Sequence, residues 1–227
     1  MAKIEWPKFG FLGLLICLVS VLVVAPFLQK NSPTVPVVRL FLTAALLFSI
    51  YAFIREKRAL INASLLAVPA FASNWASYFF NTPTTHFIKD TFSALFFGYI
   101  TVTILFGIFK KKTITSDLIY GSICVYLLIG LAWAFVYSAL ENIFSGSFNF
   151  ASNHLQANPS LNGDQIPISL FIYYSYVTLT TLGYGDIAPM TPPAQSIAIL
   201  EAITGQFYLA ILVARLVGIY ISNKSTQ

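Results

Sequence analysis

The stretch TTLGYGDIAP, residues 180–189, decides how the rest of this sequence is interpreted. Gly183 and Gly185 flank Tyr184, and Asp186 follows at once. A Gly-x-Gly pattern alone is a weak signal that usually marks only a loop or tight turn. The surroundings favour a more specific interpretation, because a short aromatic segment precedes the stretch and a long apolar segment follows it.

The composition indicates a membrane protein. The 227 residues are 57% hydrophobic and only 9% charged, whereas soluble domains carry about 25% charged residues. Six segments approach the roughly 20 apolar residues needed to cross ~30 Å of hydrocarbon. They are residues 9–28, 38–54, 60–80, 88–109, 118–140 and 194–221. We therefore expect an all-α membrane protein with six transmembrane helices.

The basic residues predict how these spans are oriented. Lysine and arginine are enriched on the cytoplasmic side of membrane proteins. Nine basic residues lie on one side of the predicted spans: Lys3, Lys8, Arg55, Lys57, Arg58, Lys110, Lys111, Lys112 and Lys224. Only Lys30, Arg39 and Lys89 lie on the other, while Arg215 lies inside the last span and is expected to reach toward the inner interface. Both termini are thus expected in the cytoplasm, and the net charge of +5 indicates topology and contact with membrane lipid rather than with nucleic acid.

The segment between the last two spans is expected to re-enter the membrane without crossing it. A polar loop, residues 141–166, leads to Asp164 and Pro167, which suit the start of a helix. The apolar run that follows ends near Thr180 and is too short to span. Non-helical backbone at membrane depth is tolerated only where protein or water covers it.

Residues 181–185 have the character of a cation site made of backbone. A cation that leaves water needs oxygens in place of its hydration shell, and successive carbonyls supply them if they point the same way. Gly183 and Gly185 permit the required backbone angles, and Thr181 adds a hydroxyl at the inner end. The preceding helix is expected to aim its partly negative carboxyl end toward the central cavity, where it favours a waiting cation.

The run FIYYSYVTLTTLGYGDIAP, residues 171–189, resembles the pore loop of the tetrameric potassium channel family. The resemblance implies a selectivity filter formed by Thr181, Leu182, Gly183, Tyr184 and Gly185, with potassium bound at the first four. Leu182 replaces the commoner valine, and because that position contributes a backbone carbonyl, the ion cage is expected to survive.

The resemblance extends to residues around the filter. Tyr173 and Tyr174 occupy places where many relatives have a bracing tryptophan pair, and a tyrosine hydroxyl there is placed to bond Asp186. Thr180 is a further candidate for filter support. Simple core packing is the alternative for the two tyrosines. Val177 stands where some relatives carry a buried glutamate, so that brace is absent.

The last span resembles the inner helix of the same family. Gly205 matches a glycine often interpreted as a gating hinge, and close helix packing is the alternative. Glu201 lies one turn earlier. An ionisable group within a span indicates function by default. Glu201 is expected to bond behind the filter, to face the central cavity, or to lie protonated against a polar neighbour; we favour the first.

The resemblance divides the chain at residue 112. Residues 1–112 resemble a voltage-sensor-like four-helix domain without gating charges, since span 88–109 has no Lys or Arg beyond Lys89. Residues 113–227 form the pore domain. His86 and His154 are placed in outer loops, where they either sense external pH or are ordinary solvated residues. Glu141, Asp164 and Asp186 either concentrate cations at the outer mouth or are ordinary loop charges.

These observations predict a potassium-selective channel that conducts passively through a homotetrameric pore and is not voltage-gated. Potassium is the permeant ligand, no cofactor is expected, and the resemblance places the protein in the plasma membrane, as in a bacterial inner membrane. A subunit of a potassium uptake transporter is the alternative, although such proteins distribute single-glycine filters over repeats. An enzyme is not expected, because the spans offer no paired carboxylates, His/Cys cluster or nucleophile elbow.

Overall fold

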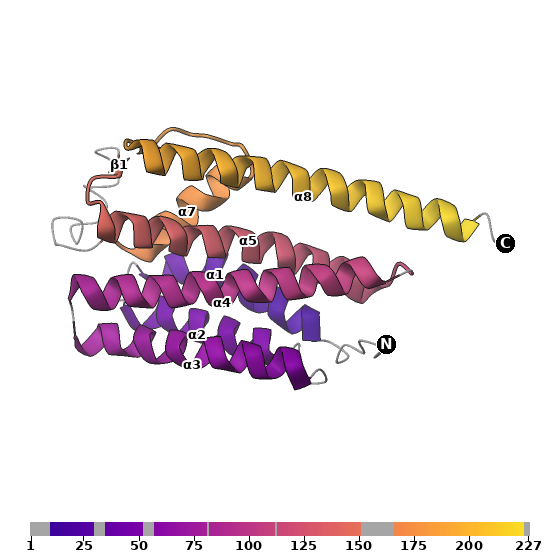
Figure 1. Ribbon diagram of the computed structural model, residues 1–227, viewed down its shortest axis with the longest axis horizontal. Helices are drawn as coiled ribbons and strands as arrows, with labels where there is room; N and C mark the ends of the chain where they lie inside the picture. The colour runs from indigo at the N-terminus through magenta and orange to yellow at the C-terminus, as the bar shows by residue number, and fades with distance from the viewer. Residues whose placement is uncertain are drawn as a thin grey trace.

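The computed structural model describes residues 10–29, 35–51, 57–80, 82–111, 113–150 and 166–224, and most of them are helical. The elements in chain order are α1 Gly10–Gln29, α2 Val35–Tyr51, α3 Lys57–Phe79, α4 Pro83–Lys110, α5 Ser116–Ile143, β1 Phe148–Phe150, α7 Ile168–Leu179, β2 Ile187–Pro189 and α8 Pro192–Lys224. The long helices run along one common direction, whereas the short α7 is set at an angle between α5 and α8 (Figure 1).

Four helices of the described part of the chain are long and apolar enough to cross a membrane: Ala59–Ser77, Pro83–Lys110, Ser116–Ile143 and Pro192–Ile221. The stretch Phe11–Val23 of α1 and the whole of α7 are shorter apolar helices. The six predicted spans correspond to α1, α2, α3, α4, α5 and α8. The start of α1 and the end of α8 lie at the same end of the bundle (Figure 1).

α4 and α5 are a pair of 28-residue helices, each with a defined start. Thr82 caps α4 with Pro83 in the first turn, and Thr115 caps α5 by accepting the N–H of Leu118. Buried residues recur every three or four positions along α4, which places one stripe of the helix against its neighbours. They include His86, Asp90, Ser93, Phe97, Thr101, Ile104 and Ile108.

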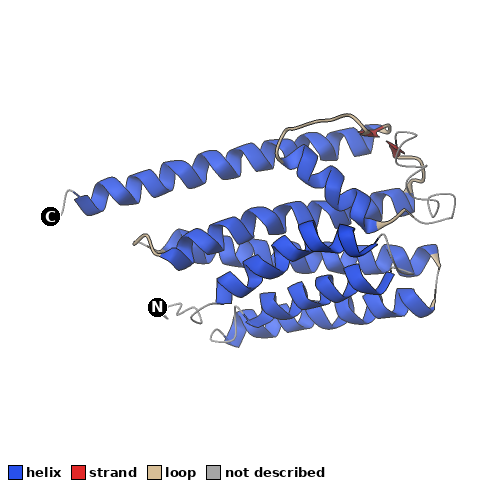
Figure 2. Ribbon diagram, turned by 180° about the vertical axis from the view of Figure 1, so that it is seen from behind, coloured by secondary structure: helices blue, strands red, loops and turns tan. Residues whose placement is uncertain are grey.

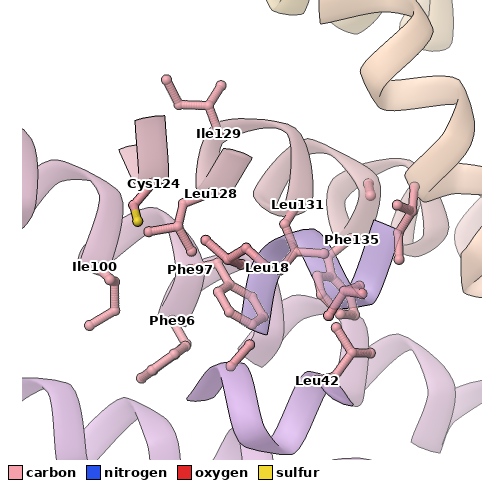
Figure 3. Packing of buried hydrophobic residues seen from close by; sticks show 14 of the residues in the cluster. Leu18, Leu42, Phe96, Phe97, Ile100, Cys124, Leu128, Ile129, Leu131 and Phe135 are labelled. Carbon is pink, nitrogen blue, oxygen red and sulfur yellow. The ribbon is translucent and has the colours of Figure 1, made fainter. Parts of the chain in front are cut away.

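One hydrophobic core joins the first helices to α5. Figure 3 shows Leu18 of α1, Leu42 of α2, Phe97 of α4 and Phe135 of α5 within one cluster. The rings of Phe97 and Phe135 stack with centroids 5.7 Å apart. Both cysteines, Cys17 of α1 and Cys124 of α5, are buried. The predicted division at residue 112 therefore crosses a continuous core, and as a functional division it stays a prediction.

A short two-stranded sheet ties the segment after α5 to the segment before α8. β1 and β2 pair antiparallel, with Phe148 opposite Pro189 and Phe150 opposite Ile187. Both strands lie at the end of the bundle where α8 begins (Figure 2). The ring of Phe148 packs edge-on against Phe171 and Tyr174 of α7. This sheet, which the sequence analysis did not predict, connects the surroundings of residues 181–185 to α5.

Candidate functional site

The backbone after α7 turns back on the helix that precedes it. The N–H of Thr180 donates to the Tyr176 carbonyl at 3.0 Å, and the N–H groups of Leu182 and Gly183 donate to the Val177 carbonyl at 2.9 and 3.3 Å. The Thr180 hydroxyl donates to the same Tyr176 carbonyl at 2.5 Å. These bonds direct the backbone N–H groups of residues 180–183 toward the carboxyl end of α7.

The segment 181–185 has an alternating backbone. Thr181, Gly183 and Gly185 have positive φ values of 59°, 57° and 75°. In an extended strand successive carbonyls alternate in direction, and reversing the hand of every second residue brings them toward one side. The sequence analysis assigned the ability to adopt such backbone angles to Gly183 and Gly185 alone. Thr181 is a β-branched residue in a region that costs it conformational energy, a form of strain that occurs at functional sites.

Residues 181–185 all lie exposed on the surface of the single chain. Tyr184 is 66% exposed and Leu182 is 58% exposed. A Cβ atom added at Gly183 or Gly185 would meet no atom of the described residues within 4 Å, apart from those of its chain neighbours. The candidate site is therefore an irregular segment held from behind by α7 and open in front, which one chain does not enclose.

The two tyrosines of α7 have different surroundings. The Tyr173 hydroxyl donates to Oδ2 of Asp186 at 2.6 Å, so the predicted contact between a tyrosine and Asp186 is present. Burial, together with that hydrogen bond, raises the pKa of Tyr173 to about 12. Tyr174 is buried and packs edge-on against Tyr137 at a centroid distance of 4.9 Å. Tyr174 thus packs in the core, and its bracing role stays a prediction.

Glu201 is buried where α8 meets α5 and α7. Its carboxyl group is bonded by the hydroxyl of Tyr137 on α5, at 2.5 Å, and by the hydroxyl of Ser175 on α7. Its side chain is 0% exposed, so of the three predicted placements it does not face an open cavity. The partners themselves were not predicted, because neither lies near Glu201 in the sequence.

Gly205 allows a close approach between α8 and the end of α7. A Cβ atom at Gly205 would lie 2.4 Å from the Leu179 carbonyl oxygen. Close packing is thus a property of this glycine, while the hinge role stays a prediction. The next residue, Gln206, places Nε2 3.5 Å from the Thr181 hydroxyl, which brings α8 to the start of the candidate site.

Two side chains differ from their predicted places. His86 is buried within α4 rather than in an outer loop. Glu141 lies in the last turn of α5 and accepts the N–H groups of Gly146 and Phe148, so its carboxylate holds the turn into β1 instead of lying free in a loop. Arg215 donates to the Lys111 carbonyl at 2.7 Å, at the end of the bundle that the sequence analysis assigns to the cytoplasm, which agrees with its expected direction. His154 and Asp164 lie outside the described residues.

A second buried carboxylate lies between α4 and α5. Asp90 accepts hydrogen bonds from Ser138 at 2.6 Å and Asn142 at 2.9 Å, and Lys89 is 3.1 Å from its other oxygen. The sequence analysis assigned no role to Asp90. The only sequence signal was the cost of an aspartate in a span, and the hydrogen-bond donors Ser138 and Asn142 come from another helix.

Within the described ranges, no group of three or more His, Cys, Asp or Glu residues is placed to hold a metal ion.

The comparisons with known proteins concern the carboxyl-terminal part of the chain. Residues 123–222 match a family model described as an ion channel. This part contains most of α5, α7, residues 181–185 and most of α8, and the match supports passive ion conduction by a helical membrane protein. No curated protein and no solved structure matches the chain.

Proposed function

We propose that this chain is one subunit of a potassium-selective channel in which residues 181–185 form the selectivity filter. The observation that carries the proposal is the positive φ at Thr181, Gly183 and Gly185 within the sequence TLGYG. An alternating backbone of this kind presents carbonyl oxygens to a partly dehydrated cation without adding net charge. Thr181, Leu182, Gly183 and Tyr184 are the proposed potassium ligands.

The pore is proposed to lie at the centre of four identical chains. The exposed front of residues 181–185 contributes one wall, and a single strand does not surround an ion. Four copies around one axis supply four walls, and the exposure of the segment in the single chain supports such an assembly. The carboxyl end of α7 points its partial negative charge toward the cavity below the filter, which favours a waiting cation.

Tyr173, Asp186 and Thr180 are the proposed filter supports. The hydrogen bond from Tyr173 holds Asp186 immediately after the filter, and the bond from Thr180 to the Tyr176 carbonyl holds the residue immediately before it. Gly205 is assigned the close contact between the inner helix and α7. No resident cofactor is part of the proposal.

The channel is proposed not to be voltage-gated in the usual manner. Gating charges are worth about 2.3 kcal/mol each per 100 mV, and several are needed for steep voltage dependence. Between Asp90 and Phe109, α4 contains no lysine or arginine. We place all six long helices across a plasma membrane with both termini in the cytoplasm, in keeping with the basic residues of the connections.

The test is reconstitution of the purified full-length chain in liposomes with potassium inside. Rapid potassium efflux, much slower sodium flux and block by barium are expected. Equal sodium and potassium flux, or potassium flux that barium leaves unchanged, would contradict a potassium-selective filter. A current–voltage series on the same preparation tests the gating statement, which a steep, saturating voltage dependence would contradict. Transport that requires an energy source would instead favour the uptake transporter.

A further inference from the structure

The carboxyl group of Glu201 lies in a fully enclosed polar cluster. Tyr137 of α5 is bonded to Oε2, Ser175 of α7 is bonded to Oε1, and Ser175 is also 2.6 Å from the Gly130 carbonyl of α5. Three helices thus meet at one side chain that is 0% exposed. A buried ionised carboxylate carries a large desolvation cost unless a charge compensates it.

The number of protons in the cluster indicates the state of Glu201. A serine hydroxyl has one proton, a tyrosine hydroxyl has one, and a backbone carbonyl has none. Tyr137 uses its proton on Oε2 of Glu201. Ser175 contacts two oxygens, and if Glu201 were ionised its single proton would serve only one of them. If Glu201 carries a proton, it donates to Ser175, Ser175 donates to Gly130, and every contact is a hydrogen bond.

The helices around Glu201 supply no positive charge to stabilise an ionised form. Residues 118–140 of α5, all of α7 and residues 192–214 of α8 contain no Lys, Arg or His. The titratable groups that interact with Glu201 are the tyrosines Tyr126, Tyr137, Tyr174 and Tyr176, and Glu141 lies one turn beyond Tyr137 on α5. β2, which also contacts α8, contains no titratable residue.

We propose that Glu201 is a protonated, neutral residue that donates a hydrogen bond to Ser175 and thereby positions α7 and the filter against the inner helix. The inference rests on the proposed function for its effect on ions, but not for the protonation itself. Ser175 lies two residues before Val177, whose carbonyl accepts the N–H groups of Leu182 and Gly183. Loss of the Glu201 proton therefore acts on the filter through one short stretch of α7.

Infrared spectroscopy of the full-length protein in liposomes tests the protonation. The difference spectrum between wild type and Glu201→Gln at neutral pH is expected to contain the carbonyl stretching band of a carboxylic acid. Asp90→Asn serves as the control, because it identifies any band from the other buried carboxyl group. A difference spectrum that contains only carboxylate bands overturns the proposal, whether or not the protein conducts.

Ion flux against pH tests the positioning role. As the pH rises past the point where the acid band disappears, the potassium-to-sodium flux ratio of wild type is expected to fall about tenfold, the effect of losing one hydrogen bond. Glu201→Gln keeps a neutral donor and is expected to remove this pH dependence. Ser175→Ala is expected to lower the ratio about as much at neutral pH.

Two further outcomes separate the inference from the function. A Glu201→Gln protein with the pH dependence of wild type overturns the positioning role. An acid band in a wild type that conducts no potassium at any pH would contradict the proposed function and the positioning role, and would leave the protonation of Glu201 supported.

Discussion

The hydroxyl of Tyr173 lies 2.6 Å from Oδ2 of Asp186, so a side chain of α7 holds the residue that directly follows segment 181–185. The other oxygen of Asp186 accepts the N–H of Ile187 at 3.1 Å. Both carboxylate oxygens are therefore engaged where the chain leaves the candidate filter and enters β2. A hydrogen bond to a charged group contributes about 1.5–3 kcal/mol, so its loss in a variant is large enough to measure.

Tyr173→Phe removes the donor and keeps the ring. We expect the potassium-to-sodium flux ratio to fall about tenfold, because Asp186 then loses a charge-assisted bond. Tyr173→Trp retains an N–H donor and is the matched control, expected to stay within about threefold of wild type. Equal losses in both variants would show that ring packing, rather than the hydrogen bond, matters.

The pH dependence of the same contact follows from the raised pKa of Tyr173. Its ordinary value is 10.0, and burial and the bond to Asp186 raise it to about 12. The proton is held more tightly in the folded chain, so the contribution of this bond is complete below pH 10 and is lost as the pH rises toward about 12. In the Glu201→Gln background, we expect a constant flux ratio up to about pH 10. A decline near neutral pH in that background would contradict this assignment.

Gly183→Ala tests the backbone of the proposed filter without a steric clash. Gly183 has a φ of +57° and no atom within 4 Å of a Cβ position, so the only expected cost is about 1 kcal/mol of backbone strain. We expect a clear loss of potassium selectivity with little change in the melting temperature of the protein. Gly98→Ala, in a helix and equally open, is the control and should leave the flux unaltered.

Gly205→Ala is expected to destabilise the contact between α8 and α7. The new Cβ atom would lie 2.4 Å from the Leu179 carbonyl oxygen, a backbone atom that does not move aside easily. We expect the free energy of unfolding in detergent to fall by about 1–3 kcal/mol, with loss of potassium flux. Gly218→Ala, further along α8 and without a neighbour within 4 Å, should be neutral or slightly stabilising. Similar losses at both glycines would indicate that helix flexibility, not close contact, explains Gly205.

Asp90→Asn is expected to weaken the pairing of α4 with α5. The substitution keeps the shape but removes the charge that Ser138, Asn142 and Lys89 contact. We expect the free energy of unfolding to fall by about 1–3 kcal/mol, measured by denaturant titration. Asp117→Asn, in the first turn of α5, is the control and should change the free energy of unfolding by only about 0.5 kcal/mol. Equal changes would mean that the Asp90 contacts contribute nothing specific.

Arg215→Ala is expected to loosen the connection between α4 and α5. The guanidinium of Arg215 donates to the Lys111 carbonyl at 2.7 Å and lies 4.7 Å from the centre of the Phe109 ring. Amide hydrogen exchange in peptides covering residues 108–116 should become about tenfold faster, while exchange in residues 171–186 is unaltered. Lys110→Ala, which removes an exposed charge at the same end, is the control. Unaltered exchange in the Arg215 variant would contradict the contact.

The features that sequence reasoning found are those with a local signal. Hydropathy over about 20 residues reports the solvent that a helix prefers, so the long helices were predicted near their observed positions. The short run before Thr180 indicated α7, and two glycines around Tyr184 indicated an unusual backbone. Thr181 also has a positive φ. The residue type does not predict this conformation, because the hydrogen bonds to the end of α7 hold the backbone there.

The sequence by itself determined a membrane-embedded helical chain and the short segment that resembles a potassium filter, since apolar length and glycine placement act locally. Only the tertiary structure decided which residues meet. Glu201 pairs with Tyr137 from 64 positions away, and Asp90 pairs with Ser138 from 48 positions away. Within a bilayer every helix is apolar on most sides, so hydropathy does not select partners, and buried polar groups find theirs only when the helices pack.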